Sequence, residues 1–247
     1  MAIRENFTYT DMDEWLNAKR VTEIECLVPD LTGVARGKIL PRTKFTEERG
    51  MRLPEAVLGM TVTGNSPTDD EAYDRAISAT DRDMILKADP TTITMVPWAV
   101  DQTAQVIHDC YFANGELVDF APRTVLRRVL KLYEEKGWTP LVAPELEFYL
   151  TKPNDDPNVE IEPPIGRTGR RGSSRQAYSM VAVDEFGEVI DTIYDFAEAQ
   201  GLTIDSVIQE SGAGQIEINL NHGDQVFNAH AVRAFLVVAG LVREDHA

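Results

Sequence analysis

Four glutamates, Glu145, Glu147, Glu210 and Glu217, lie in short segments where apolar and polar residues alternate. Successive side chains of an extended strand point to opposite faces, so Glu145 and Glu147 share one face and the intervening apolar residues share the other. Residues 215–221 repeat the pattern around Glu217. Carboxylates crowded on one face repel one another unless a cation lies between them, and oxygen ligands suit Mg²⁺ or Mn²⁺. The pattern therefore predicts a metal site on a sheet.

An antiparallel sheet with one solvated face also alternates in this way, so a single Glu-x-Glu strand favours an ordinary wet surface. The second motif shifts the balance towards a site. Gly212 and Gly214 allow a tight turn between antiparallel strands, which would bring Glu210 and Glu217 opposite one another. The alternation before Glu210 is less regular, and we expect a bulge to aim this residue.

The wider pattern predicts an α+β fold with a small amino-terminal domain over residues 1–112 and a second domain over 113–247. The second domain is expected to be an antiparallel sheet backed by helices, with its other face acidic. The expected helices are 10–19, capped by Thr10, then 122–137, 186–200 and an apolar helix at 227–243. The expected strands are 21–28, 34–40, 91–96, 104–110, 139–152, 203–210 and 215–221, with loops at 61–83 and 153–174.

Composition excludes some classes of function. The sequence has 24 Lys and Arg against 41 Asp and Glu, a formal net charge of −17, which disfavours binding to nucleic acid or to an anionic membrane. Cys26 and Cys110 lack the spacing of a metal or redox motif, and we interpret both as structural residues of a cytoplasmic protein. No signal-peptide-like or membrane-spanning apolar run is present.

Two other residue groups have several interpretations. Four arginines in residues 153–175 could meet an anionic substrate or a neighbouring subunit, although a solvated loop is the simpler reading; they are Arg167, Arg170, Arg171 and Arg175. The four histidines are scattered, and we expect surface or helix positions for them, which disfavours a metal hydrolase. They are His108, His222, His230 and His246.

Together the two glutamate motifs resemble those of the glutamine synthetase family, whose metal cage combines a Glu-x-Glu strand with a later Glu followed by Gly-x-Gly-Gln-x-Glu. Here these are residues 145–147 and 210–217. Residues 30–38 look like the family's amino-terminal hairpin, and residues 89–98 resemble the segment after it. Residues 147–150 and 217–220 look most like the γ-glutamylpolyamine synthetase branch. The resemblance implies a β-grasp-like first domain and the first part of a glutamine synthetase-type catalytic domain.

The resemblance also implies a chemistry. ATP would phosphorylate the side-chain carboxylate of glutamate, and an amine, ammonia or a polyamine, would displace phosphate from γ-glutamyl phosphate to form an amide. Glu147, Glu210 and Glu217 would hold one Mg²⁺ or Mn²⁺ ion, and Glu145 would help to hold a second against the ATP phosphates. Asp205 falls where the family has an acidic residue near the nucleotide. Family members are homo-oligomers of stacked rings, so the same assembly is expected.

Two departures from the family pattern limit these expectations. Thr61 occupies the position where the family usually has an aspartate that binds ammonium, and a neutral hydroxyl lacks that charge. A larger amine than ammonia, or an altered chemistry, is therefore more plausible. The sequence also ends before the family's His-x-His element, its Asn-Gly loop and its arginine-rich contacts, so the chain looks truncated within the catalytic domain. The alternative is a truncated, non-catalytic homologue that binds metal or assembles with other subunits.

Overall fold

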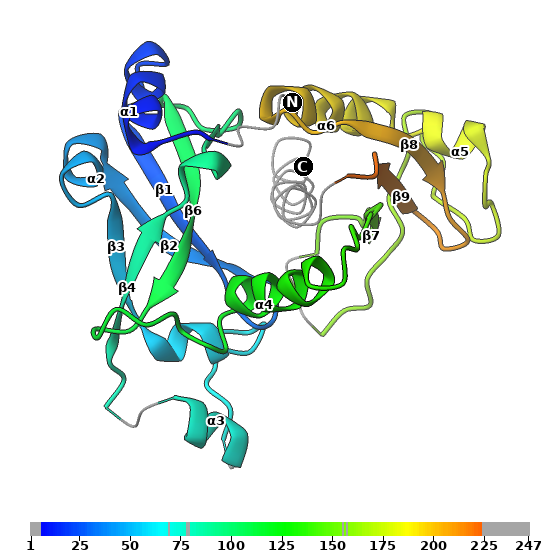
Figure 1. Ribbon diagram of the computed structural model, residues 1–247. Coiled ribbons are helices and arrows are strands. Elements are labelled where there is room, and N and C mark those ends of the chain that lie inside the picture. The colour runs from blue at the N-terminus through cyan, green and yellow to red at the C-terminus, as the bar shows by residue number, and fades with distance from the viewer. Residues whose placement is uncertain (1–5, 69, 78–79, 155, 157, 224–247) are drawn as a thin grey trace. The chain divides into compact units, whose positions relative to one another are not determined.

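The computed structural model describes residues 6–68, 70–77, 80–154, 156 and 158–223 (Figure 1). The chain divides into two compact units, one of residues 2–139 and the other of residues 140–247 with Met1. The domain boundary expected at 112/113 stays a prediction. Within the described residues, no helix is long and apolar enough to cross a bilayer.

The first unit is built on a mixed sheet in the order β2-β1-β6-β4-β3, with the short strand β5 paired to β6. Strands β1 and β6 run parallel, and the other neighbours run antiparallel. Strand β6 is buried along most of its length, as expected for the middle strand of a sheet. The strands are β1 (Glu23–Pro29), β2 (Ala35–Pro41), β3 (Gly50–Pro54), β4 (Asp83–Ala88), β5 (Thr94–Met95) and β6 (Thr103–Tyr111).

Four α-helices accompany this sheet: α1 (Tyr9–Ala18), α2 (Arg42–Glu48), α3 (Glu71–Ala76) and α4 (Pro122–Glu134). Helix α1 begins after Thr8, whose hydroxyl accepts a hydrogen bond from the Asp11 N–H while the Asp11 carboxylate accepts one from the Thr8 N–H. The expected cap at Thr10 is therefore wrong. Helix α3 lies inside the stretch predicted as a loop; the Asp70 side chain caps its first turn.

The core of the first unit joins α1 and α2 to the sheet. Met12, Leu16 and Phe45 are fully buried in one cluster with apolar residues of β1, β4 and β6. Cys26 and Cys110 are buried and form no disulfide, as expected for structural residues. His108 on β6 is also fully buried, so the expectation that it lies on the surface or in a helix is wrong.

Charged side chains fasten helix α4 to the sheet. Arg123 is 8% exposed and contacts Asp109 through Nε at 2.9 Å and Asp89 through Nη2 at 2.6 Å. Arg127, one turn later, contacts Asp89 at 3.2 Å and Asp109 at 3.0 Å. The apolar stripe that predicts this helix is still 44% exposed at Val125. Ion pairing therefore accounts for much of the docking of α4 within the first unit.

The second unit contains a three-stranded antiparallel sheet in the order β7-β9-β8 (Figure 1). Its strands are β7 (Glu145–Tyr149), β8 (Ile204–Gln209) and β9 (Gln215–Leu220), and its helices are α5 (Met180–Asp184) and α6 (Gly187–Gln200). Helix α6 ends at Gly201, which adopts the left-handed conformation with φ +74°. Strand β7 is shorter than the predicted strand at 139–152.

The apolar core of the second unit confirms the alternation read from the sequence. Leu146, Ile216 and Ile218 are buried on one face of the sheet, and Ile190 and Ile193 of α6 are buried as well. The mixed α+β class is confirmed. The predicted helix at 227–243 lies outside the described residues.

Candidate functional site

The pairing of β7 with β9 brings two of the glutamates directly together. Glu147 is the register partner of Glu217, and Glu145 is the partner of Asn219. Directly opposite residues of an antiparallel pair project to the same face, with Cβ atoms about 4.5–5.5 Å apart. Glu145, Glu147 and Glu217 therefore share the face opposite to the apolar core.

A bulge at Asp205 in β8 places Glu210 on the same face. Ile204 pairs with Leu220 and Ser206 with Asn219, so Asp205 is the extra residue between them. The extra residue shifts the alternation by one position, and Glu210 then pairs with Gln215, to whose carbonyl its N–H donates at 2.9 Å. The expected bulge is present, but the expectation that Glu210 and Glu217 lie directly opposite one another is wrong, because Glu217 pairs with Ile208.

Asp205 itself lies apart from Glu210. It is exposed at the far end of β8 from Glu210, about 16 Å along the strand at the usual rise per residue. Its predicted role beside a nucleotide stays a prediction.

The turn between Glu210 and Glu217 is held by internal hydrogen bonds. The side chain of Gln209 is 2% exposed, and its Nε2 donates to the carbonyls of Glu210 and Gly212, each at 2.9 Å. Gly214 has φ +74°, and a Cβ there would lie 2.7 Å from the carbonyl oxygen of Leu150. Both constraints fix the backbone that separates the two glutamates.

Neutral amides contact two of the carboxylates. Nε2 of Gln215 donates to Oε2 of Glu147 at 2.7 Å, and Nδ2 of Asn219 donates to Oε1 of Glu217 at 3.0 Å. Among the described residues, none of the four glutamates forms an ion pair with Lys, Arg or His. Within the part of the chain that the structure describes, these carboxylates therefore stand together without an ion-paired basic side chain.

The donor chemistry of this face suits a hard divalent ion, because every candidate ligand atom is a carboxylate oxygen. Glu147 is exposed, while Glu210 and Glu217 are half-buried. Within the described part of the chain, no three His, Cys, Asp or Glu side chains stand close enough to form a ligand group. The strands thus supply the register and the donors, and rotation of the Glu210 and Glu217 side chains would have to close the group around Glu147. The four glutamates remain predicted metal ligands.

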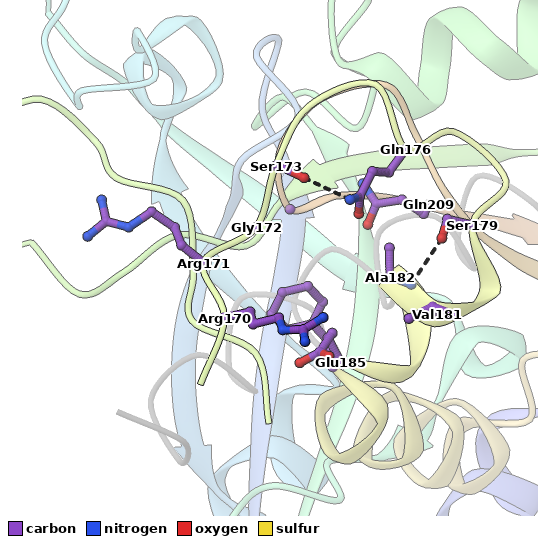
Figure 2. Close-up of a pocket in the computed structure, with 12 residues that line it drawn as sticks. Arg170, Arg171, Gly172, Ser173, Gln176, Ser179, Val181, Ala182, Glu185 and Gln209 are labelled. Carbon is purple, nitrogen blue, oxygen red and sulfur yellow. Dashed lines mark hydrogen bonds between the residues drawn. The ribbon is translucent and has the colours of Figure 1, made fainter. Parts of the chain in front are cut away.

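A second feature, a cavity of about 180 Å³, lies beside the β8–β9 turn in the second unit (Figure 2). Its wall includes Arg170, Ser173, Gln176 and Glu185. Thr168 donates through its N–H and its hydroxyl to Glu185, and these hydrogen bonds hold the pKa of Glu185 below its usual value. The side chain of Glu185 is thereby fixed at the rim.

Two of the four clustered arginines are neutralised nearby. Arg171 points away from the cavity in Figure 2 and pairs with Glu162 at 3.0 Å, and Arg167 pairs with Asp184. A contact of this cluster with an anionic substrate or with another subunit stays a prediction.

Thr61, in the first unit, lies in a turn that is tied to the β1–β2 hairpin. Nη2 of Arg36 donates to the Thr61 carbonyl at 3.1 Å, and Nε of Arg36 pairs with buried Asp30 at 2.8 Å. The Thr61 hydroxyl is 3.1 Å from the Thr63 hydroxyl and accepts a hydrogen bond from the Asn65 N–H at 3.1 Å. Local hydrogen bonds therefore engage this hydroxyl.

Sequence reasoning did not assign functional importance to Gln209 or Gln215. The available signal for Gln209 is its place in the strand alternation, one residue before Glu210. With the bulge at Asp205, this alternation turns the polar side chain of Gln209 towards the core. Gln215 lies within the quoted motif, but its hydrogen bonds to a strand distant in sequence emerge only from the fold.

Comparisons with known proteins agree on one family. The model described as "Glutamine synthetase, catalytic domain" matches residues 119–246. Gamma-glutamylputrescine synthetase PuuA of Escherichia coli (strain K12) is 30% identical over 210 residues, covering 83% of this chain and 43% of the relative. Glutamine synthetase of Pyrococcus horikoshii is 28% identical over 230 residues, covering 92% and 46%. Glutamate–isopropylamine ligase of a Pseudomonas species is 29% identical over 143 residues, covering 58% and 30%.

Solved structures agree on the fold. The structure titled "Apo GmaS without ligand" has a TM-score of 0.74 at 21% identity, and the match covers 96% of this chain and 51% of that chain. The chain thus spans about half the length of that protein, and a little under half of the first two relatives above.

Proposed function

We propose a function from one premise: this chain belongs to the glutamine synthetase family. The protein that contains it is an ATP-dependent carboxylate–amine ligase. It forms a γ-glutamyl amide through a γ-glutamyl phosphate intermediate. The names of the relatives support this class, since all three are ligases or synthetases that join an amine to glutamate or form glutamine.

One observation carries the proposal: Glu147 and Glu217 are direct register partners, and among the described residues neither forms an ion pair with a basic side chain. An ordinary solvated sheet face tends to place opposite charges, or none, across a strand pair, because like charges directly opposite are destabilising. A divalent ion bound between Glu147 and Glu217 would explain why two carboxylates stand directly opposite one another.

The four glutamates then have separate roles. Glu147, Glu210 and Glu217 hold one Mg²⁺ or Mn²⁺ ion beside the amino-acid substrate, and Glu145 helps to hold a second beside the phosphates of ATP. When bound, these ions offset the negative charge shared by the carboxylate nucleophile and the phosphoryl donor. Asp205, exposed at the bulge of β8, contributes to the nucleotide side of the site.

The amine is larger than ammonia. Thr61 offers a neutral hydroxyl that is already hydrogen-bonded to Thr63 and Asn65, so it supplies no negative charge for an ammonium ion. Two of the relatives above have names that include putrescine and isopropylamine. A polyamine of the putrescine type is the substrate that we propose.

We base proposals for assembly and location on the same family membership. The protein forms a homo-oligomer of stacked rings and works in the cytoplasm, consistent with two buried free cysteines in the first unit. The first unit, with the parallel pair β1–β6 at the middle of its sheet, serves as a β-grasp-like domain. Light scattering of the full-length protein would measure the oligomeric state.

The test is a product assay on the full-length protein with glutamate, ATP, Mn²⁺ and either ammonia or putrescine. Phosphate release and mass spectrometry of the amide are measured together. We expect a γ-glutamyl amide with putrescine and less product with ammonia. Glu217→Gln should form no amide. Equal rates with the two amines would overturn the amine assignment. Absence of any amide from a folded, metal-binding protein would favour the alternative, a non-catalytic homologue.

A further inference from the structure

The side chain of Gln215 joins three segments of the polar face. Its Oε1 accepts one hydrogen bond from the Tyr149 hydroxyl at 3.1 Å and another from the Gly212 N–H at 2.9 Å. Its Nε2 donates to Oε2 of Glu147 at 2.7 Å. The amide therefore connects β9, the β8–β9 turn and β7 at the point where Glu147 stands.

These partners determine which way the amide faces. The Gly212 N–H can act only as a donor and the Glu147 carboxylate only as an acceptor, so Oε1 must face the turn and Nε2 must face Glu147. A flipped amide would set its oxygen against the carboxylate and its N–H against another N–H. Gln215 is thus held in one orientation by Gly212 and Glu147.

Gly212 provides the room for this arrangement. A Cβ at position 212 would lie 2.6 Å from the Tyr149 hydroxyl oxygen and 2.7 Å from Oε1 of Gln215. The Gly212 backbone does not have a positive φ, so space rather than backbone conformation accounts for glycine here. Any side chain at 212 would displace the tyrosine and the amide together.

We propose that Gln215 is a positioning residue for metal binding, which fixes one oxygen of Glu147 so that the other stays available on the face shared with Glu217. This inference rests on the proposed function. An exposed glutamate has several rotamers of similar energy, and restricting Glu147 to one lowers the entropy lost when an ion binds. Groups that orient a ligand in this way typically change metal affinity about 10–100-fold.

The experiment measures Mn²⁺ affinity of the full-length protein by calorimetry. Gln215→Met keeps the length of the side chain and removes both hydrogen-bonding groups, and Tyr149→Phe removes one of the two groups that hold the amide. We expect Mn²⁺ to bind at least about tenfold more weakly to Gln215→Met than to the wild type, with a smaller loss of affinity in Tyr149→Phe. Asn221→Leu, which removes an exposed amide just beyond β9, is the matched control and should bind as the wild type does.

A second readout separates positioning from a structural role. We expect the melting temperature of metal-free Gln215→Met to stay near that of the wild type, while the electron paramagnetic resonance spectrum of its bound Mn²⁺ changes. A wild-type Mn²⁺ affinity in Gln215→Met would overturn the inference. A weaker Mn²⁺ affinity would also overturn it if metal-free Gln215→Met proved to be unfolded. A wild-type protein that binds no Mn²⁺ would overturn the proposed function as well, whereas normal Mn²⁺ binding without amide formation would overturn the proposed function alone.

Discussion

Replacing Arg123 by methionine should strongly destabilise the first unit. The guanidinium lies between Asp89 and Asp109, whose side chains are each 13% exposed, and its removal leaves two largely buried carboxylates with weaker compensation. Breaking a buried ion pair costs about 3–5 kcal/mol. Arg127 keeps its contacts with both carboxylates, so we expect the lower end of that range, about 3 kcal/mol.

Urea titration monitored by tryptophan fluorescence is a suitable assay, because all three tryptophans, Trp15, Trp98 and Trp138, lie in the first unit. Arg127→Met is the control. It removes a guanidinium that contacts the same carboxylates but is 45% exposed, and it should cost less than about 1 kcal/mol. Equal losses of unfolding free energy in the two variants would refute the reasoning.

The same variant should change the response to acid. Burial raises the pKa of Asp89, but hydrogen bonds from Thr91 and the charge of Arg123 outweigh burial and hold that pKa below 3.8. The stability contributed by Asp89 is therefore complete above the unfolded-state pKa and is lost as pH falls through the lower folded-state pKa. Without Arg123 the folded-state pKa rises, so acid unfolding should begin at a higher pH than in the wild type.

Two further predictions concern the first unit. Burial lowers the pKa of His108 from 6.5 to about 4, so the unfolded state binds more protons than the folded state between these pH values. The unfolding free energy should therefore fall by up to about 3 kcal/mol as pH drops from 6.5 to 4. In urea titrations across this range the unfolding free energy of His108→Leu should depend less on pH, and an unchanged dependence would contradict the assignment. A Cβ at Gly37 would lie 1.9 Å from the carbonyl oxygen of Cys26 on the paired strand, so Gly37→Ala should lower the unfolding free energy by more than about 2 kcal/mol. Gly33 has φ +82° but open space around it, so Gly33→Ala should lower the unfolding free energy by about 1 kcal/mol in the same assay.

The polar face was predictable because strand alternation has a period of two. Once Leu146 and Ile218 are assigned to the core, Glu147 and Glu217 must occupy the other face, and the antiparallel register then makes them partners. The position of the bulge was harder to predict from the sequence. It depends on how Asp205 fits between Ile204 and Ser206 against β9, which no local pattern specifies.

The missed elements have physical reasons of their own. Helix α3 has six residues, none buried, and its formation depends on the cap at Asp70 rather than on an apolar stripe. His108 was misjudged because its burial comes from the neighbouring strands of β6, and a histidine carries no sequence signal for such a position. The hydrogen bond of Gln215 to Glu147 joins residues 68 positions apart, so it too depends on the assembled sheet.

The central claim is that Glu147, Glu210 and Glu217 converge on one divalent ion. The most direct measurement is a calorimetric Mn²⁺ titration of the full-length protein and of Glu147→Ala, with Glu198→Ala, an exposed glutamate on α6, as the control for loss of one negative charge. We predict that Glu147→Ala abolishes binding at this ion's site while Glu198→Ala binds as the wild type does. Unchanged affinity in Glu147→Ala would contradict the account.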